Sequence, residues 1–126
     1  MTTELQIRPA SDQAAGEILA WSRDVIDPAL RGAVAQLPPS MRRIAGYHFG
    51  WWDSAETPTA GNAGKAVRPA LALLSARAVG GDAEAAIPPA VAVELVHNFS
   101  LLHDDVMDGD LTRRHRATAW TFARPF

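Results

Sequence analysis

Apolar residues recur along this chain at intervals of three and four positions, which predicts helices. The first helix is expected to follow Ser11 or Asp12, because either side chain can cap a helix start. Proline is favoured in the first turn of a helix, so Pro28 predicts a separate amphipathic piece over Asp27 to Leu37. Pro38-Pro39 then ends that piece.

Three more helical segments are expected further along the chain. A short one starts at Ser40 and precedes residues 51–64, whose glycine, proline and asparagine content is typical of a loop. Strong helix formers fill Pro69 to Val79, and Gly80-Gly81 is a suitable stop. The last helix is expected from about Ala90 to Met107. No segment alternates like a strand over a useful length, so the predicted fold class is all-α.

Composition narrows the class of protein. The chain has 126 residues with 48% hydrophobic and 21% charged, which is typical of a folded domain, and we expect a single helical domain over residues 1–126. A net charge of -2 argues against nucleic acid as a partner, and the lack of cysteine excludes disulfides and thiolate metal sites. Arg23, Arg77 and Glu94 interrupt the apolar runs, so we expect no stable membrane insertion and a cytoplasmic location.

The last predicted helix has two unlike faces. At about 100° per residue, its polar side chains fall within an arc of roughly 120°. The opposite side is expected to pack on neighbouring helices, which would turn the polar face toward a cavity or solvent. The polar face holds Glu94, His97, Asn98, Asp104, Asp105 and Asp108, and the apolar side holds Ala92, Leu95, Val96, Phe99, Leu102 and Val106.

The aspartates on this face predict a metal site. Asp104 and Asp108 are one turn apart, about 6 Å along the axis, so two carboxylates could share a divalent cation. The alternative is a solvated helix end, because acidic runs are common on exposed surfaces. Negative charge at the carboxyl end of a helix interacts unfavourably with the macrodipole, and a bound cation would offset that cost. The metal site is therefore favoured over a solvated helix end. Oxygen ligands alone indicate a hard cation, and Mg2+ is the expected one.

Two basic clusters could bind phosphate oxygens. Arg113, Arg114, His115 and Arg116 follow the aspartates, and Lys65 and Arg68 precede the helix start expected at Pro69. Taken alone, each cluster could be ordinary surface cations. Two cationic clusters and one acidic cluster together indicate two diphosphates, one bridged by magnesium and the other bound by cations alone.

Several motifs occur in an order and spacing that resemble the trans-isoprenyl diphosphate synthases. The resemblance runs from about Gly64 to Trp120 and implies antiparallel helices around a deep central cavity, usually in a homodimer. It implies prenyl transfer from an allylic diphosphate to isopentenyl diphosphate with Mg2+. The motifs are Gly64-Lys65-Ala66-Val67-Arg68-Pro69, Glu94-Leu-Val-His97, Leu101-Leu-His-Asp104-Asp105-Val-Met-Asp108, Arg113-Arg114 and Thr118-Ala119-Trp120.

The same resemblance implies roles for individual residues. The first aspartate-rich motif would be Asp104, Asp105 and Asp108, with Asp104 and Asp108 as the direct magnesium ligands for the allylic diphosphate. Arg113 would bind that same diphosphate. Phe99 and Ser100 would help to set the product length, for which we expect C15 to C20. The residues implied for the isopentenyl diphosphate are Lys65, Arg68, His97 and Arg114.

The chain also departs from the pattern of these synthases. Ala63 and Ala66 stand where the family usually has a glycine and a basic residue. Residues 121–126 are an atypical end, and the second aspartate-rich motif does not follow, so we expect a truncation or a shifted reading frame near Thr121. One alternative is therefore a catalytically inactive helical fragment or an interaction partner.

A second alternative is a metal-dependent phosphohydrolase built on His103-Asp104. Helix geometry argues against it, because His103 points about 100° away from Asp104 and toward the apolar side. We therefore expect His103 to be a core histidine. Zinc bound by His97 and His103 is disfavoured too, since residues six apart do not share a helix face.

Overall fold

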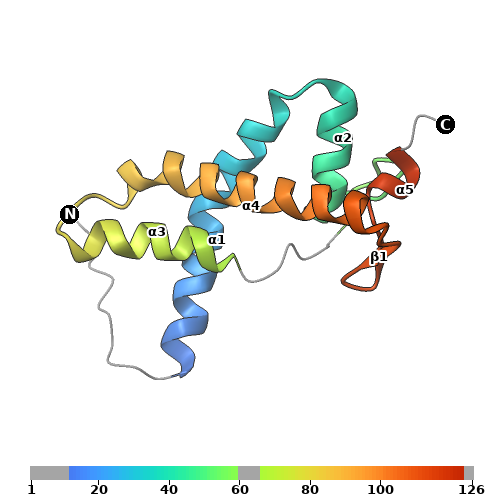
Figure 1. Cartoon of the computed structure of the whole chain (residues 1–126). Coiled ribbons are helices and arrows are strands. Elements are labelled where there is room, and N and C mark those ends of the chain that lie inside the picture. The colour runs from blue at the N-terminus through green and yellow to red at the C-terminus, as the bar shows by residue number, and fades with distance from the viewer. Residues whose placement is uncertain (1–11, 60–65, 124–126) are drawn as a thin grey trace.

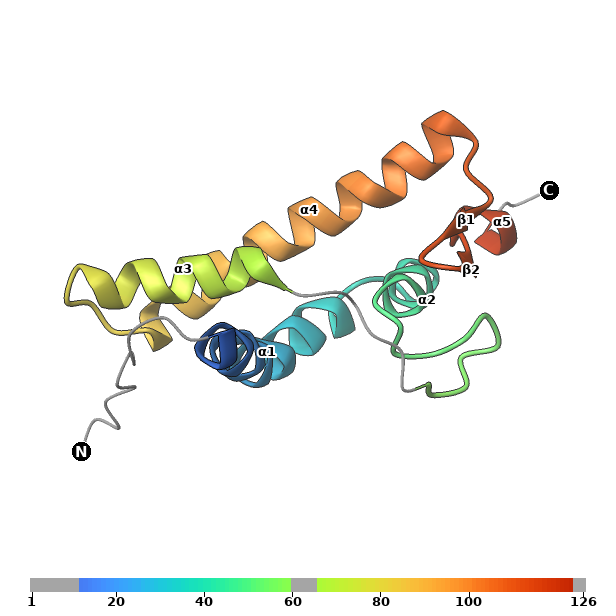
Figure 2. The same cartoon turned by 90° about the horizontal axis from the view of Figure 1, so that it is seen from below.

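The computed structural model describes residues 12–59 and 66–123, and it confirms the all-α class (Figure 1). Helices α3 and α4 run side by side in opposite directions, and α1 crosses them on one face (Figures 1 and 2). Helix α2 and a small hairpin lie toward the carboxyl end of α4. The elements are α1 (Asp12–Ala35), α2 (Pro39–His48), α3 (Val67–Ala78), the 3-10 turn η1 (Glu84–Ala86), α4 (Ile87–Asp108), β1 (Thr112–Arg113), β2 (Arg116–Ala117) and α5 (Trp120–Ala123).

Helix α1 is continuous, so the prediction of two pieces divided near Pro28 is wrong. Ser22, Ile26, Leu30 and Val34 repeat every fourth residue and are all buried, on both sides of the proline. This face packs with Leu73 and Ala90 into one core, and burying it outweighs the backbone hydrogen bond that proline removes. The stop predicted at Gly80-Gly81 is confirmed, because α3 ends at Ala78.

Helix α4 packs on the face opposite to the one predicted. Its buried residues include Glu94, Asn98 and Asp105, whereas Val96 is 70% exposed and Phe99 38% exposed. The prediction that the apolar side packs on its neighbours is wrong for the described part of the chain, apart from residues such as Leu95 that touch the core. Polar side chains can be buried here because neighbouring elements supply hydrogen-bond partners. We call Val93, Val96, Phe99, Val106 and Met107 the exposed apolar face of α4.

His103 is also exposed, so the prediction of a core histidine is wrong. Its side of α4 does not pack on the described residues, which follows from the inverted packing of the helix. Within the described residues, the stretch Glu84–Asp108 is long and apolar enough to cross a membrane by length and composition alone. Glu94 and Asp105 lie in that stretch with their side chains buried against the domain.

The hairpin after α4 was not predicted from the sequence. Thr112 pairs with Ala117 and Arg113 with Arg116, and the two-residue turn between them is Arg114-His115. Both turn residues have positive φ, 51° and 64°, which is the backbone of a type I′ turn. Such turns favour asparagine and glycine, so an arginine and a histidine gave no turn signal.

The turn should become more stable when its second residue is glycine. His115→Gly is expected to raise the free energy of unfolding by about 0.5 kcal/mol, because glycine adopts positive φ without the steric penalty of a side chain. Urea unfolding measures the change. Thr112→Gly is the matched control in the adjoining strand and should lower stability, since no positive φ is relieved there. Equal effects of the two substitutions would contradict this account of the turn.

Candidate functional site

The end of α4 presents two exposed carboxylates and one buried one. Asp104 and Asp108 are exposed and one helical turn apart, whereas Asp105 is 2% exposed. Among the described residues, no group of three or more histidine, cysteine, aspartate or glutamate side chains is arranged to hold a metal ion. Two carboxylates leave most positions around a hard cation open. This donor set fits Mg2+, which is commonly held by one or two carboxylates together with substrate phosphates and water.

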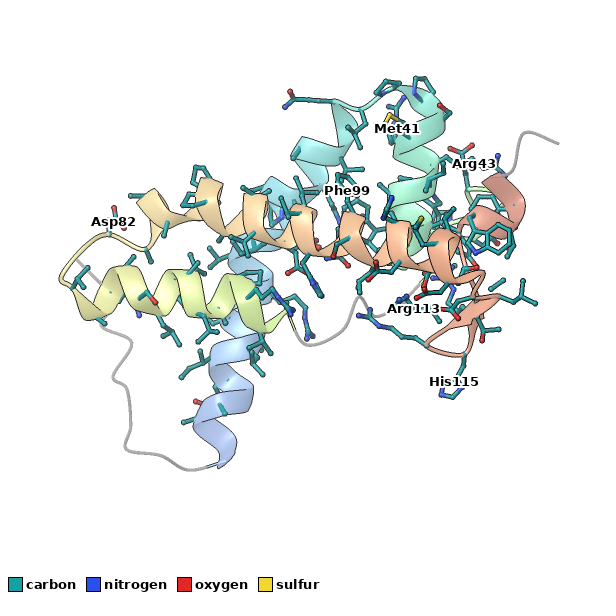
Figure 3. All side chains as sticks on the ribbon, in the orientation of Figure 1. Met41, Arg43, Asp82, Phe99, Arg113 and His115 are labelled. Atoms are coloured by element: carbon teal, nitrogen blue, oxygen red, sulfur yellow. The ribbon has the colours of Figure 1, made fainter. Side chains whose placement is uncertain are left out.

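Arg113, which Figure 3 labels near the carboxyl end of α4, forms an ion pair with Asp105. Arg113 donates from Nη2 to Asp105 Oδ1 at 2.7 Å, and from Nε to Oδ1 and Oδ2 at 3.1 and 2.9 Å. This hydrogen bonding raises the pKa of Arg113 above its usual value. Nη1 and the second N–H of Nη2 are not used by Asp105, so the guanidinium can still donate to an anion beside the exposed aspartates. Asp105 therefore orients Arg113 in this arrangement.

A second group of predicted residues meets in one cavity. Arg68 comes from the first turn of α3, His97 from the middle of α4 and Arg114 from the hairpin turn, and all three line a cavity of about 140 Å³. Glu94 is the one acidic residue among its described lining, alongside these cationic or basic groups. The cavity is therefore suited to an anion that accepts several charge-assisted hydrogen bonds. Lys65, which was predicted for the same ligand, lies outside the described residues.

A buried polar network supports one wall of this cavity. Asn98 Nδ2 donates to the Glu94 carbonyl at 2.8 Å and to Glu94 Oε1 at 2.9 Å. Because the amide nitrogen is the donor in both bonds, Asn98 Oδ1 must accept from His48 Nε2, at 2.9 Å. His48 was not predicted, since it lies fifty positions away on α2. The sequence did place Glu94 and Asn98 together on the polar face.

The stability of this network should depend on pH through His48. Burial lowers the pKa of His48 below its usual 6.5, and the nearby charges of Arg114 and Arg113 lower it further. The hydrogen bond to Asn98 and the charge of Asp105 raise the pKa, but the net change is a decrease. As the pH falls, the unfolded chain therefore takes up a proton first. The stabilisation is complete above the unfolded pKa and is lost as the pH falls toward the lower folded pKa.

Urea unfolding between about pH 7.5 and pH 5.5 measures this dependence. The free energy of unfolding is expected to decline over that range in the unsubstituted chain and to decline less in His48→Gln. Glutamine keeps a donor for Asn98 but does not titrate. His115→Gln is the matched control at an exposed histidine and should decline like the unsubstituted chain. Parallel curves for all three proteins would show that His48 does not set the dependence.

The basic cluster 113–116 does not act as one surface. Arg113 turns toward Asp105, and Arg114 lines the cavity with Arg68. His115 is exposed at the tip of the hairpin (Figure 3). Arg116 donates from Nη1 to the Tyr47 carbonyl at 2.9 Å and so contacts α2. The prediction of a single basic cluster on phosphate oxygens is corrected accordingly.

The two residues predicted to set product length lie on the outward side of α4. Phe99 belongs to the exposed apolar face, and exposed Ser100 donates a hydrogen bond to the His97 carbonyl at 2.6 Å. A groove of about 420 Å³ lies nearer the start of α4, and its lining includes neither of these two residues but Arg68, Ala92, Val93, Val96 and His97. Arg68 and His97 thus border both the anion cavity and an apolar groove. The roles of Phe99 and Ser100 stay predictions.

Comparison with known proteins identifies the family. The polyprenyl synthetase family model matches residues 51–122. The (2E,6E)-farnesyl diphosphate synthase of Mycobacterium tuberculosis is 52% identical over 103 residues, which cover 82% of this chain and 29% of that protein. The geranylgeranyl diphosphate synthase of the same organism is 48% identical over 104 residues, covering 82% and 30%.

A solved structure agrees with these relatives. The crystal structure of a polyprenyl synthetase from Streptomyces coelicolor A3(2) is similar with a TM-score of 0.83 and 55% identity, over 88% of this chain and 33% of that one. The chain spans about a third of the length of the relatives that it matches. Because the family model covers more than half of the 126 residues, the chain belongs to the polyprenyl synthetase family.

Proposed function

We propose that this chain supplies the two diphosphate-binding sides of a prenyltransferase that joins isopentenyl diphosphate to an allylic diphosphate. The observation that carries the proposal is the meeting of Arg68, His97 and Arg114 in one cavity, beside a helix that ends in two exposed aspartates. One anion would be bound by cations alone, and the other through carboxylates and a divalent cation. Such a pair of unlike sites would let one diphosphate be activated as a leaving group while the other is only bound.

On the allylic side, Asp104 and Asp108 would hold Mg2+. When bound, that cation neutralises charge on the departing diphosphate. Arg113 would add N–H donors to the same diphosphate, held in place by its bonds to Asp105. The departing group leaves with the electron pair of its bond to the allylic carbon, and these donors stabilise the charge that develops.

On the other side, Arg68, His97 and Arg114 would bind the diphosphate of isopentenyl diphosphate, with Lys65 as a further predicted donor. The double bond of this substrate then attacks the cationic allylic carbon, a carbon–carbon bond forms, and a proton is lost. The apolar groove beside Arg68 and His97 would receive the hydrocarbon part of a substrate. Phe99 and Ser100 would limit the growing chain to about C15 to C20, as the resemblance implies.

The expected setting of the protein is also part of this proposal. We infer a homodimer in the cytoplasm, with no nucleic-acid partner and no stable membrane insertion. The polar residues on the packed side of α4 favour a role in a domain over a membrane span, because Glu94 and Asp105 have protein partners.

A direct assay tests the proposed reaction. The purified chain is incubated with Mg2+, isopentenyl diphosphate and each of the C5, C10 and C15 allylic diphosphates, and products are identified by mass spectrometry. A prenyl product supports the proposal and gives its length. If no product forms but magnesium-dependent diphosphate binding remains, the binding half of the proposal stands and these residues alone do not catalyse. The absence of both product and binding favours the inactive-fragment alternative.

The phosphohydrolase alternative has less support. His103 and Asp104 are neighbours on α4, so their side chains point about 100° apart, and the relatives are named as farnesyl and geranylgeranyl diphosphate synthases. The same incubation distinguishes it, because a phosphohydrolase would release inorganic phosphate without a longer prenyl chain.

A further inference from the structure

The turn that carries Arg114 depends on contacts from outside the hairpin. Arg114 and His115 both have positive φ, and each flanking strand has only two residues. A hairpin of this size has little stability of its own. Arg113 also lies directly opposite Arg116, and like charges across a strand pair are unfavourable. The position of Arg114 is therefore set by what holds the two strands.

One strand is held by α4 and the other by α2. On β1, Arg113 is bound to Asp105, as described above. On β2, Arg116 donates from Nη1 to the Tyr47 carbonyl at 2.9 Å, and its guanidinium lies 4.0 Å from the centre of the Tyr47 ring. The Tyr47 hydroxyl in turn donates to the Ala117 carbonyl at 2.6 Å. We call these reciprocal contacts the Tyr47–Arg116 clamp.

The part of α2 that carries this clamp is packed into the core. Ala45 and Phe49 on either side of Tyr47 are 1% exposed and belong to the central core. Trp52 Nε1 donates to the Arg43 carbonyl at 3.0 Å and closes the loop after α2 back onto the helix. The residue next to Tyr47 is His48, which bonds to Asn98 of the anion cavity. The carboxyl end of α2 thus touches both the hairpin and the α4 wall of the cavity.

We propose that Tyr47 and Arg116 are positioning residues for Arg114. They hold β2 so that the turn presents Arg114 to the cavity shared with Arg68 and His97. Arg116 itself contacts backbone carbonyls and an aromatic ring, so its charge is directed away from a ligand. The inference rests on the proposed diphosphate binding and extends it to residues outside the cavity.

Arg116→Lys tests the clamp without removing the positive charge. Lysine lacks the planar fork that bonds and stacks on Tyr47, so the turn should loosen. Inorganic pyrophosphate, titrated calorimetrically in the presence of a chelator, is expected to bind about fivefold more weakly. Tyr47→Phe removes only the hydroxyl bond to Ala117 and should weaken binding in the same direction. Circular dichroism confirms that each variant remains folded.

The matched control is Arg77→Lys. Arg77 also stacks on an aromatic ring, 4.9 Å from the centre of Trp21, but lies at the other end of α3 from Arg68. This variant loses an equivalent stacking contact remote from the cavity. Its pyrophosphate affinity is expected to match that of the unsubstituted chain.

Repeating the substitution in a chain without the Arg114 side chain separates positioning of Arg114 from a general structural effect. If the clamp acts through Arg114, Arg116→Lys should cause no further loss of affinity in a chain that already carries Arg114→Ala. A loss of the same size in that background overturns the inference. So does unchanged affinity in folded Arg116→Lys and Tyr47→Phe chains. If the unsubstituted chain binds no pyrophosphate, the proposed function fails first and the inference fails with it.

Discussion

Asp105→Ala is expected to lower the free energy of unfolding by about 3 kcal/mol, because it leaves the partly buried Arg113 guanidinium without its carboxylate partner. The Asp105 side chain is 3% exposed but that of Arg113 is 29% exposed, so water can solvate part of the guanidinium left behind, and the expected loss is at the lower end for a broken buried ion pair. The hairpin would also lose the side-chain contact of Arg113 with α4. Urea unfolding at neutral pH measures the change.

Asp108→Ala is the matched control for that experiment. It removes an exposed aspartate from the same helix end, and its stability is expected to stay within about 0.5 kcal/mol of the unsubstituted chain. The double variant Asp105→Ala with Arg113→Met should recover part of the loss, because no unpaired charge remains. If Asp105→Ala is no more destabilising than Asp108→Ala, the pair does not hold the hairpin.

Asp104→Ala, unlike Asp105→Ala, is expected to affect ligand binding and not stability. Asp104 is exposed, so its removal should hardly change stability, yet binding of pyrophosphate in the presence of Mg2+ should weaken by about tenfold or more. The reason is that one of the two carboxylates proposed to hold the cation is lost. Calorimetric titration with and without Mg2+ separates the magnesium-dependent part of the binding.

Asp24→Ala controls for the change in net charge, since Asp24 is an exposed aspartate on α1. Its magnesium-dependent affinity should be unchanged. Equal weakening in Asp24→Ala and Asp104→Ala would indicate a general effect of charge and would contradict a magnesium site at the end of α4.

Helix positions were largely predictable, but the packing of α4 was not. Periodicity and the stop at Gly80-Gly81 located α3 and α4 to within a few residues. Pro28 led to a wrong prediction of two helices, because the buried apolar face of α1 extends on both sides of the proline. The packed face of α4 could not be derived from its own sequence, since the buried side chains of Asn98 and Asp105 have partners on other elements, His48 on α2 and Arg113 on β1.

The residues of the candidate site could be predicted from the sequence, but their contacts with one another could not. Spacing identified the aspartates, and family motifs identified Arg68, His97 and Arg114, which the structure brings into one cavity. No local pattern could separate Asp105 from Asp104, because only the contact with Arg113 makes one structural and leaves the other exposed. His48 and Tyr47 were missed for the same reason, since their partners lie 50 and 70 positions away.

The most direct test of the two-site account is a titration of the isotope-labelled chain with inorganic pyrophosphate, followed by nuclear magnetic resonance, first with a chelator and then with Mg2+. The account predicts that resonances of Arg68, His97 and Arg114 shift without metal, and that those of Asp104 and Asp108 shift only once Mg2+ is added. Shifts spread over unrelated surface residues, or the same set of shifts in both conditions, would contradict it.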